Sequence, residues 1–460
     1  MRRLPLTFLV LLLLVLVPVS LVFAQPLDWK NLLEVFPKTP DPQEPINRGA
    51  FAAMLVEAAD LPLVEDSALP AGDVDPGSWY IPALSTLKQK GIMAGYTDGT
   101  LRPTKPVTRV EAAVMVARTL GLTGTLHRPE VNSPLGSTHW GITLYNWLID
   151  QGLITGQLDP AKQLTVAEAA ELLARVFGSD PQAVAVVEKS QQAAAKVQAM
   201  SMETAIDVAV KPRAGLAGQA PVFKMSGRMD MKMILPATWY MSGRFCFEPA
   251  GAPGTGTGEM EQYYVDGKLY LKMPDPVTGK AEWVKMNMPE LEDLMAKQLQ
   301  SQMASNGMPP ELKSKFHYHL LGTTQKNGQT VYEIGYYGRI DDLAAVFKFF
   351  IPEAMRSQFS GPEFENALNE FAKLIRSVSF WGKDYIGTTD YLPYGGDVTT
   401  VMTLSDKFGD QAIPVELVEM RVQIGKYSYG DGIKIELPAE AKEAKELPVP
   451  QQDNALPGTK

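Results

Sequence analysis

The sequence predicts an α+β protein with an N-terminal all-α helical bundle of three repeats, followed by a curved, half-barrel-like antiparallel β-sheet covered by helices. Two observations carry this prediction. Trp79 and Trp140, and likewise Gly91 and Gly152, lie 61 residues apart within similar segments, which indicates an internal repeat. From Ser201 onward the apolar spacing changes from about 3.6 residues to 2, which is typical of strands.

Composition limits the classes of protein to which this chain can belong. Its 460 residues suggest about two to four domains. A net charge of -9, with no basic block interleaved with aromatics, argues against nucleic-acid binding. The single cysteine, Cys246, excludes an intramolecular disulfide and any multi-cysteine metal site.

The N-terminus predicts export. Two arginines precede an apolar run at residues 4–24, and Val22-Phe23-Ala24 suits a cleavage site, so we expect residues 1–24 to be a signal peptide. The run is also long enough to act as an uncleaved anchor. Contact with a membrane is therefore expected only if the segment is not cleaved.

Three copies of a helix, turn, loop and helix unit follow. The copies cover about residues 27–66, 72–121 and 135–178. The second helix begins TRVEAAVMVARTLG at Thr108, TVAEAAELLARVFG at Thr165 and, more weakly, NRGAFAAMLVEAADL at Asn47. Since one such unit cannot bury its apolar face alone, the three copies are predicted to share one core.

Thr108 and Glu111 form a capping box at the start of a helix. Arg109, between them, places a cation beside the unpaired N–H groups of the first turn, which predicts a pocket for an external anion. The alternative is a surface arginine in an ordinary cap. The first copy keeps Arg48 but lacks the glutamate, and the third copy has Val166 in place of the arginine.

Residues 79–111 match the pattern W-Y-x-x-A-[LI]-x-x-L-x-x-x-G-I-M-x-G-Y-x-D-G-T-[LF]-x-P-x-x-x-[VI]-T-R-x-E, and residues 27–178 resemble three S-layer homology repeats. The resemblance implies a secreted, S-layer-associated protein of the cell wall and cell surface that binds secondary cell-wall polysaccharide, often pyruvylated, without a covalent bond. It makes Arg109 the main ligand residue. The residues that we expect to bind polysaccharide are Arg109, Glu111, Thr108, Arg48, Trp79 and Asp98. A buried core position is the alternative for Trp79, and a turn is the alternative for Asp98.

The rest of the chain is divided by composition. Residues 179–200 predict a helix that is either a spacer or the first helix of the next domain. Residues 201–437 predict the sheet domain, and the polar, proline-rich residues 438–460 predict a disordered tail.

Within the sheet domain, turn chemistry and apolar spacing place the elements. Asp266-Gly267 and Asn327-Gly328 predict hairpins. Helices are expected from Pro289 and across residues 341–378, and the last strand is expected at residues 432–437.

Met225, Met229 and Met231 alternate with polar residues, which predicts either a packed core or a groove for an apolar ligand. The M-x-G-x-M-x-M strand and the Y-x-x-G-K-L-Y-[LM]-K-M-P hairpin at residues 264–274 resemble bacterial lipoprotein carriers and LolA-like half-barrel proteins. That resemblance implies helices closing a curved sheet over a cavity for a lipid or other apolar ligand.

The sequence displays no catalytic motif. His317 and His319 alternate along one predicted strand, as metal ligands often do, but no other ligand completes a site. Cys246 lacks a histidine partner, so we expect no enzyme, no cofactor and no metal. Two alternatives stay open: a purely structural or envelope-sensing protein without a ligand, and a wall-modifying hydrolase whose carboxylate pair is not displayed.

Overall fold

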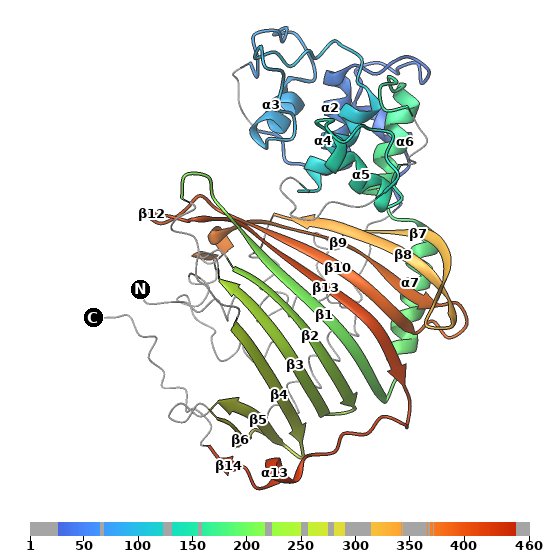
Figure 1. Ribbon diagram of the computed structural model, residues 1–460. Helices are drawn as coiled ribbons and strands as arrows, with labels where there is room; N and C mark the ends of the chain where they lie inside the picture. The colour runs from blue at the N-terminus through green and yellow to red at the C-terminus, as the bar shows by residue number, and fades with distance from the viewer. Residues whose placement is uncertain are drawn as a thin grey trace.

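A computed structural model shows a helical module followed by a sheet domain, and the chain passes from one to the other between α6 (Val166–Phe177) and α7 (Pro181–Ala194) (Figure 1). The structure describes residues 26–64, 69–122, 131–154, 159–216, 223–249, 256–274, 280–289, 314–341 and 372–447, with a few single positions between 342 and 371. The signal peptide expected at residues 1–24 lies outside this part of the chain. None of the helices in the described ranges has both the length and the apolar character needed to span a membrane.

The helical module is built from the three copies. Its elements are η1 (Asn31–Val35), α2 (Arg48–Ala58), α3 (Ile81–Gln89), α4 (Arg109–Thr119), α5 (Ile142–Asp150) and α6 (Val166–Phe177). Helices α2, α4 and α6 are the second helices of the copies, and Phe51, Val116 and Leu173 on them are fully buried. All three residues belong to one apolar cluster, so the copies share a core.

A ring of backbone hydrogen bonds ties the copies together at the residue before each helix cap. The Ile46 N–H donates to the Leu164 carbonyl, the Leu164 N–H to the Val107 carbonyl, and the Val107 N–H to the Ile46 carbonyl, at 3.0, 3.0 and 2.9 Å. Each copy donates to one neighbour and accepts from the other. The arrangement therefore has pseudo-threefold symmetry.

The sheet domain is organised around one large sheet. In the described residues its twelve strands are β1 (Ala199–Pro212), β2 (Phe223–Ile234), β3 (Thr238–Pro249), β4 (Gly256–Val265), β5 (Lys268–Pro274), β6 (Ala281–Asn287), β7 (Phe316–Lys326), β8 (Gln329–Ile340), β9 (Ile375–Gly387), β10 (Pro393–Leu404), β13 (Val415–Tyr429) and β14 (Lys445–Glu446). The spatial order is β14-β6-β5-β4-β3-β2-β1-β13-β10-β9-β8-β7, and only β14 with β6 is parallel. The short β11 (Lys407–Phe408) and β12 (Gln411–Ala412) pair separately. The predicted fold class, a helical bundle followed by a large antiparallel sheet, is confirmed.

Strand alternation divides the side chains of the sheet between two faces. Helix α7 (Pro181–Ala194) lies against β7 and β9 on one face, which we call the α7 face, and its Val186 shares a buried cluster with Val208 and Ile334. The helical module packs on the other face, which we call the module face. Tyr337 and Trp381 on that face belong to the buried cluster of the module.

The helical module is docked on β8 and β9. Trp147 of α5 meets the rings of Tyr337 and Trp381 edge to face, with centroids 6.0 and 5.6 Å apart. The Tyr337 hydroxyl donates to the Val176 carbonyl at 2.6 Å, and Arg339 donates to the Thr119 carbonyl at 3.3 Å. Apolar packing and hydrogen bonds from Tyr337 and Arg339 therefore join the two parts.

Two predicted boundaries are wrong. Helix α7 is not a spacer, because Ala183 and Val186 are buried against the sheet, and it is the first helix of the sheet domain. The predicted disordered tail is ordered at residues 438–447. There α13 (Ala439–Lys442) packs Ala441 on Trp283 and β14 pairs with β6, because small apolar side chains fit against the aromatic rings of β4 to β6.

Two predicted elements also differ. Ile375 and Val378 were expected on a helix, but they lie in β9, where pairing with β10 outweighs their helical spacing. The strand expected at residues 432–437 does not form, and Ile435 packs in the aromatic cluster instead. The helix expected from Pro289 and most of the one across residues 341–378 lie outside the described residues.

Both predicted hairpins are confirmed. Asp266 and Gly267 have φ angles of 51° and 73°, and Asn327 and Gly328 have φ angles of 50° and 79°. These left-handed pairs join β4 to β5 and β7 to β8, as the Asp-Gly and Asn-Gly signals require.

Candidate functional site

The second helix of each copy begins with a side-chain cap. Thr108 accepts from the Glu111 N–H, and the Glu111 carboxylate accepts from the Thr108 N–H at 3.0 Å, so the predicted capping box is present. Thr165 and Glu168 form the same box on α6. Asn47 caps α2 without a glutamate.

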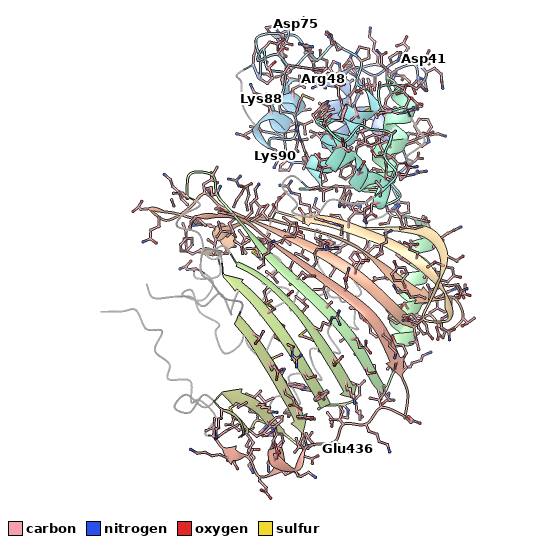
Figure 2. All side chains as sticks on the ribbon, viewed as in Figure 1. Asp41, Arg48, Asp75, Lys88, Lys90 and Glu436 are labelled. Atoms are coloured by element: carbon pink, nitrogen blue, oxygen red, sulfur yellow. The ribbon has the colours of Figure 1, made fainter. Side chains whose placement is uncertain are left out.

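Arg48 of the first copy is buried against the second copy, among the packed helices of the module (Figure 2). Its guanidinium donates to the Glu111 carboxylate and to the Leu101 carbonyl, both at 3.0 Å, and lies over the Tyr96 ring. Only 7% of the Arg48 side chain is exposed. Burial opposes ionisation of Glu111, but hydrogen bonds from Thr108 and Tyr96 outweigh it and lower its pKa. Arg48 is therefore a structural cation, closed to solvent.

Arg109 forms the same kind of ion pair with the third copy, but its side chain is more exposed than that of Arg48. Its guanidinium donates to the Glu168 carboxylate at 2.9 Å and to the Asp159 carbonyl at 3.5 Å. Lys162 donates to the same Glu168 oxygen at 3.2 Å. The Arg109 side chain is 14% exposed and that of Lys162 is 54% exposed. Two cations thus share one carboxylate at the edge of the module.

The helix N–H groups do not form the anion pocket that the sequence predicts. The N–H groups of Arg109 and Val110 donate to the carbonyls of Lys162 and Pro160, at 2.9 and 3.0 Å. The next copy therefore already satisfies the first-turn donors of α4 through its backbone. Any anion at this junction has to be held by the side chains of Arg109 and Lys162.

The junction between the third copy and the first lacks both charges. The arginine position is Val166 in the third copy, and the glutamate position is Ala50 in the first. Both residues are buried, at 4% and 3% exposure. A charge at only one of these positions would be buried without a partner, so the two neutral residues are matched to each other.

Trp79 and Trp140 hold matching positions in the second and third copies, and they are 38% and 63% exposed. Neither is a buried core residue. Trp140 directly precedes Gly141, whose Cα side packs against Val110, the neighbour of Arg109 in sequence. The segment that carries Trp140 therefore packs against the first turn of α4, the helix that begins with Arg109.

Asp98 is a turn residue. Its carboxylate accepts from the Thr100 hydroxyl at 2.6 Å and from Arg102 at 2.8 Å, and these bonds lower its pKa. The Arg102 guanidinium lies 3.8 Å from the centre of the Tyr96 ring, which also contacts Arg48. Asp98 therefore belongs to the surroundings of the first junction.

The predicted site residues consequently do not form one site. Arg48, Glu111, Thr108 and Asp98 surround the first junction, whereas Arg109 lies at the second. Sequence reasoning missed Lys162 and Trp140. The repeat of 61 residues signals Trp140, because it aligns with Trp79. Nothing in the sequence signals Lys162, whose approach to Glu168 depends on the fold.

His317 and His319 serve the interface between module and sheet. The Nε2 atom of His319 lies 2.9 Å from the Tyr337 hydroxyl, and the His317 ring packs edge to face on Phe177. Burial lowers the pKa of His317 to about 3 and that of His319 to about 4, so both are neutral near pH 7. In the described ranges, no three His, Cys, Asp or Glu side chains are arranged to hold a metal.

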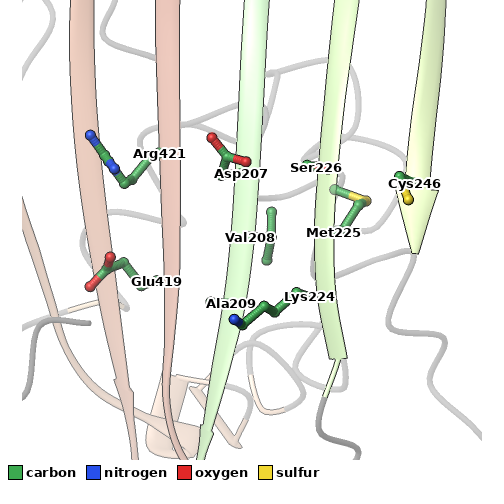
Figure 3. A pocket seen from close by; sticks show the side chains of 9 residues that line it. All are labelled: Asp207, Val208, Ala209, Lys224, Met225, Ser226, Cys246, Glu419 and Arg421. Atoms are coloured by element: carbon green, nitrogen blue, oxygen red, sulfur yellow. The ribbon is translucent and has the colours of Figure 1, made fainter. Parts of the chain in front are cut away.

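A groove of about 310 Å³ lies on the module face across β13, β1, β2 and β3 (Figure 3). Its lining includes two bases, Arg421 and Lys224, two acids, Asp207 and Glu419, and also Cys246. Lys224 and Asp207 are exposed, as on an ordinary solvated sheet face. The balanced charges favour neither an anion nor a cation.

Comparison with known proteins identifies both parts of the chain. Residues 72–113 match the S-layer homology domain, and residues 182–446 match a family of unknown function, DUF6612. The chain belongs to the DUF6612 family. It is a cell-surface, S-layer-associated DUF6612 protein, in which an S-layer homology domain precedes the family's own domain.

The DUF6612 protein also resembles individual proteins over part of its length. It is 25% identical to an S-layer protein of Bacillus thuringiensis subsp. finitimus over 189 residues, which are 39% of this chain and 22% of that protein. It is 26% identical to the S-layer protein sap of Bacillus anthracis over 148 residues, 30% of this chain and 18% of that one. The chain thus spans about a fifth of the length of these relatives. Among solved structures, LprF from Mycobacterium bovis aligns with 57% of this chain and 99% of its own, at 12% identity and a TM-score of 0.27.

Proposed function

We propose that the helical module binds an anionic secondary cell-wall polysaccharide at the junction of its second and third copies, and thereby holds the DUF6612 domain at the cell surface. The observation that carries this proposal is the convergence of Arg109 and Lys162 on Glu168. The exposed Trp140, on the segment that packs against α4, is a second candidate contact. A pyruvylated sugar carries a carboxylate, which suits the planar fork of an arginine. An exposed indole offers a flat apolar surface to a sugar ring.

The second junction suits a ligand better than the first. A guanidinium has five N–H donors, and the contacts of Arg109 with Glu168 and the Asp159 carbonyl leave donors for a further acceptor. Arg48 at the first junction is enclosed by Glu111 and Leu101 and is 7% exposed. We therefore assign the polysaccharide to Arg109 and not to Arg48.

Sedimentation with purified cell walls tests the assignment. Lys162→Ala and Trp140→Ala change exposed side chains, so we expect folded variants that bind walls roughly three- to tenfold more weakly. Arg109→Lys keeps the positive charge but loses the planar guanidinium, which can bind a carboxylate through two parallel hydrogen bonds. This variant should bind walls about tenfold more weakly or worse. Lys90→Ala, at the exposed end of α3, is the matched control (Figure 2). Equal binding by all four variants would contradict the proposal.

We infer further that the sheet domain holds a lipid or other apolar ligand on its α7 face. The support comes from methionines that strand register assigns to this face and that are partly exposed: Met200, Met202, Met229, Met231, Met233, Met241, Met260 and Met286. Methionine side chains adapt to ligands of varied shape, and they are over-used at promiscuous apolar surfaces.

Native mass spectrometry and solvent extraction of the purified chain test this second part. We expect an apolar compound to co-purify and to leave on extraction. A chain that carries no such compound and takes up no apolar probe supports the alternative of a purely structural or envelope-sensing protein.

A further inference from the structure

We propose that Asp384 binds the polar head of the apolar ligand, and that this head is a primary ammonium group. The proposal rests on the ligand inferred for the α7 face, and it adds the chemistry of one end of that ligand.

Asp384 is an acid on the apolar side of the sheet. Along β9 it alternates with Phe380 and Ile386, which are buried in the cluster of the α7 face. Its cross-strand partners are Ile334 on β8 and Gly396 on β10. The carboxylate is therefore surrounded by apolar side chains and a glycine.

Among the described residues, no cation is paired with this carboxylate. Asp384 makes no hydrogen bond and no ion pair with any residue in the described ranges. The neighbouring Lys383 points to the module face, where it pairs with Glu333 at 3.1 Å. Burial, together with the charge of Asp397, raises the pKa of Asp384 to about 7. Asp384 is half-buried, and a carboxylate in apolar surroundings is stabilised by a cation, so the position favours a cationic ligand group.

Gly396 keeps the space beside the carboxylate clear of side chains. A Cβ atom at this position would lie 2.8 Å from the Asp384 Oδ1 atom, so any other residue would crowd the acid. Tyr427 of β13 lies on the same face, and its pKa is raised by burial and by the charge of Asp384. Tyr336 is not available, because its hydroxyl donates to the Asp397 carbonyl at 3.0 Å.

An ammonium group matches this pair of oxygen acceptors. It offers three N–H donors for the Asp384 carboxylate, and the Tyr427 hydroxyl is a further acceptor on the same face. An anionic head would face the negative charge of Asp384. Tyr427 on β13 is the cross-strand partner of Met202 on β1. The Tyr427 position is therefore adjacent to the methionine-rich strands on the same face. A long-chain primary amine can therefore extend its tail along β1 to β3.

Three probes with the same tail test the proposal on the full chain: dodecylamine, dodecanol and dodecanoate, each below its micelle concentration at pH 8. The wild type should bind dodecylamine at least about tenfold more tightly than dodecanol in calorimetry, and dodecanoate more weakly than either. Asp384→Asn, which keeps the size of the side chain, should abolish the preference for the amine over dodecanol. Asp207→Asn, at an exposed acid on the module face, is the matched control.

The outcomes separate this proposal from the one on which it rests. Equal binding of dodecylamine and dodecanol, or an amine preference that survives Asp384→Asn in a variant of normal melting temperature, overturns the ammonium site but leaves the apolar ligand in place. Failure of the wild type to bind any of the three probes overturns both.

Discussion

The Arg109 guanidinium of the second copy and the Glu168 carboxylate of the third lie 2.9 Å apart, and Arg48 and Glu111 repeat this pair one junction earlier at 3.0 Å. In both cases the first residue of one helix reaches the third residue of the helix in the next copy. The glutamate thus caps its own helix and also neutralises the cation of the preceding copy. At these two junctions, the motif that starts a helix is therefore also the motif that joins the repeats.

The two arginines should differ in their effect on stability. Arg48→Ala leaves the carboxylate of Glu111 without its cation in a buried place, so the unfolding free energy of the module should fall by about 3 kcal/mol. Arg109→Ala leaves the more exposed Glu168 carboxylate paired with Lys162. The unfolding free energy should therefore fall by only about 1 kcal/mol. Urea denaturation followed by circular dichroism measures both values. Equal losses would show that the two junctions are equivalent.

The third junction offers a double-mutant test of the pseudo-symmetry. Val166→Arg alone buries an unpaired charge and should lower the unfolding free energy by about 3 kcal/mol. Adding Ala50→Glu supplies the missing partner, and should restore at least about 1 kcal/mol as a coupling energy. Additive losses would show that Val166 and Ala50 do not face each other.

The histidines make the docking of the module sensitive to acid. Their pKa values in the folded chain, about 3 for His317 and about 4 for His319, lie below the value of about 6.5 for an unfolded chain. The unfolded state therefore binds protons more readily, so this stability is complete above pH 6.5 and is lost as the pH falls toward 4. His319→Gln should flatten that part of the pH profile of the unfolding free energy. His139→Gln, beside Trp140, should leave the profile unchanged.

Asp384 should make the unfolding free energy depend on pH in the opposite direction. Its pKa in the folded chain, about 7, lies above the ordinary value of 3.8, so the folded state binds the proton more tightly. The resulting stability is complete below pH 3.8 and is lost as the pH rises through 7. The unfolding free energy of Asp384→Asn should therefore rise by about 4 kcal/mol relative to that of the wild type between pH 4 and pH 8. A difference that does not change with pH would contradict the assignment.

The sequence predicts correctly those elements whose formation depends only on neighbouring residues. The cap of Thr108 and Glu111 and the turns at Asp266-Gly267 and Asn327-Gly328 depend only on neighbouring residues, and all of them form as predicted. Ile375 and Val378 have the spacing of a helix, but their partners on β10 are distant in sequence and place them in a strand. Tertiary pairing outweighed local spacing there.

The candidate site was harder to predict, because its interacting groups come from different copies of the repeat. Arg109 stands out in its own helix, but its carboxylate partner comes from the third copy, and so do the carbonyls that occupy the helix N–H groups. Asp384 gave no signal at all. Its significance depends on which face of the sheet it occupies and on the lack of a paired cation among the described residues.

The docking of Trp147 between Tyr337 and Trp381 has a mechanical consequence. A module attached through a flexible linker can rotate freely, so the domain that follows the linker has no fixed orientation relative to it. Here the chain passes from α6 to α7 through residues 178–180, and aromatic rings lock the two parts against each other. Force applied to the helical module is therefore transmitted to β8 and β9, and the sheet keeps a fixed orientation relative to the module.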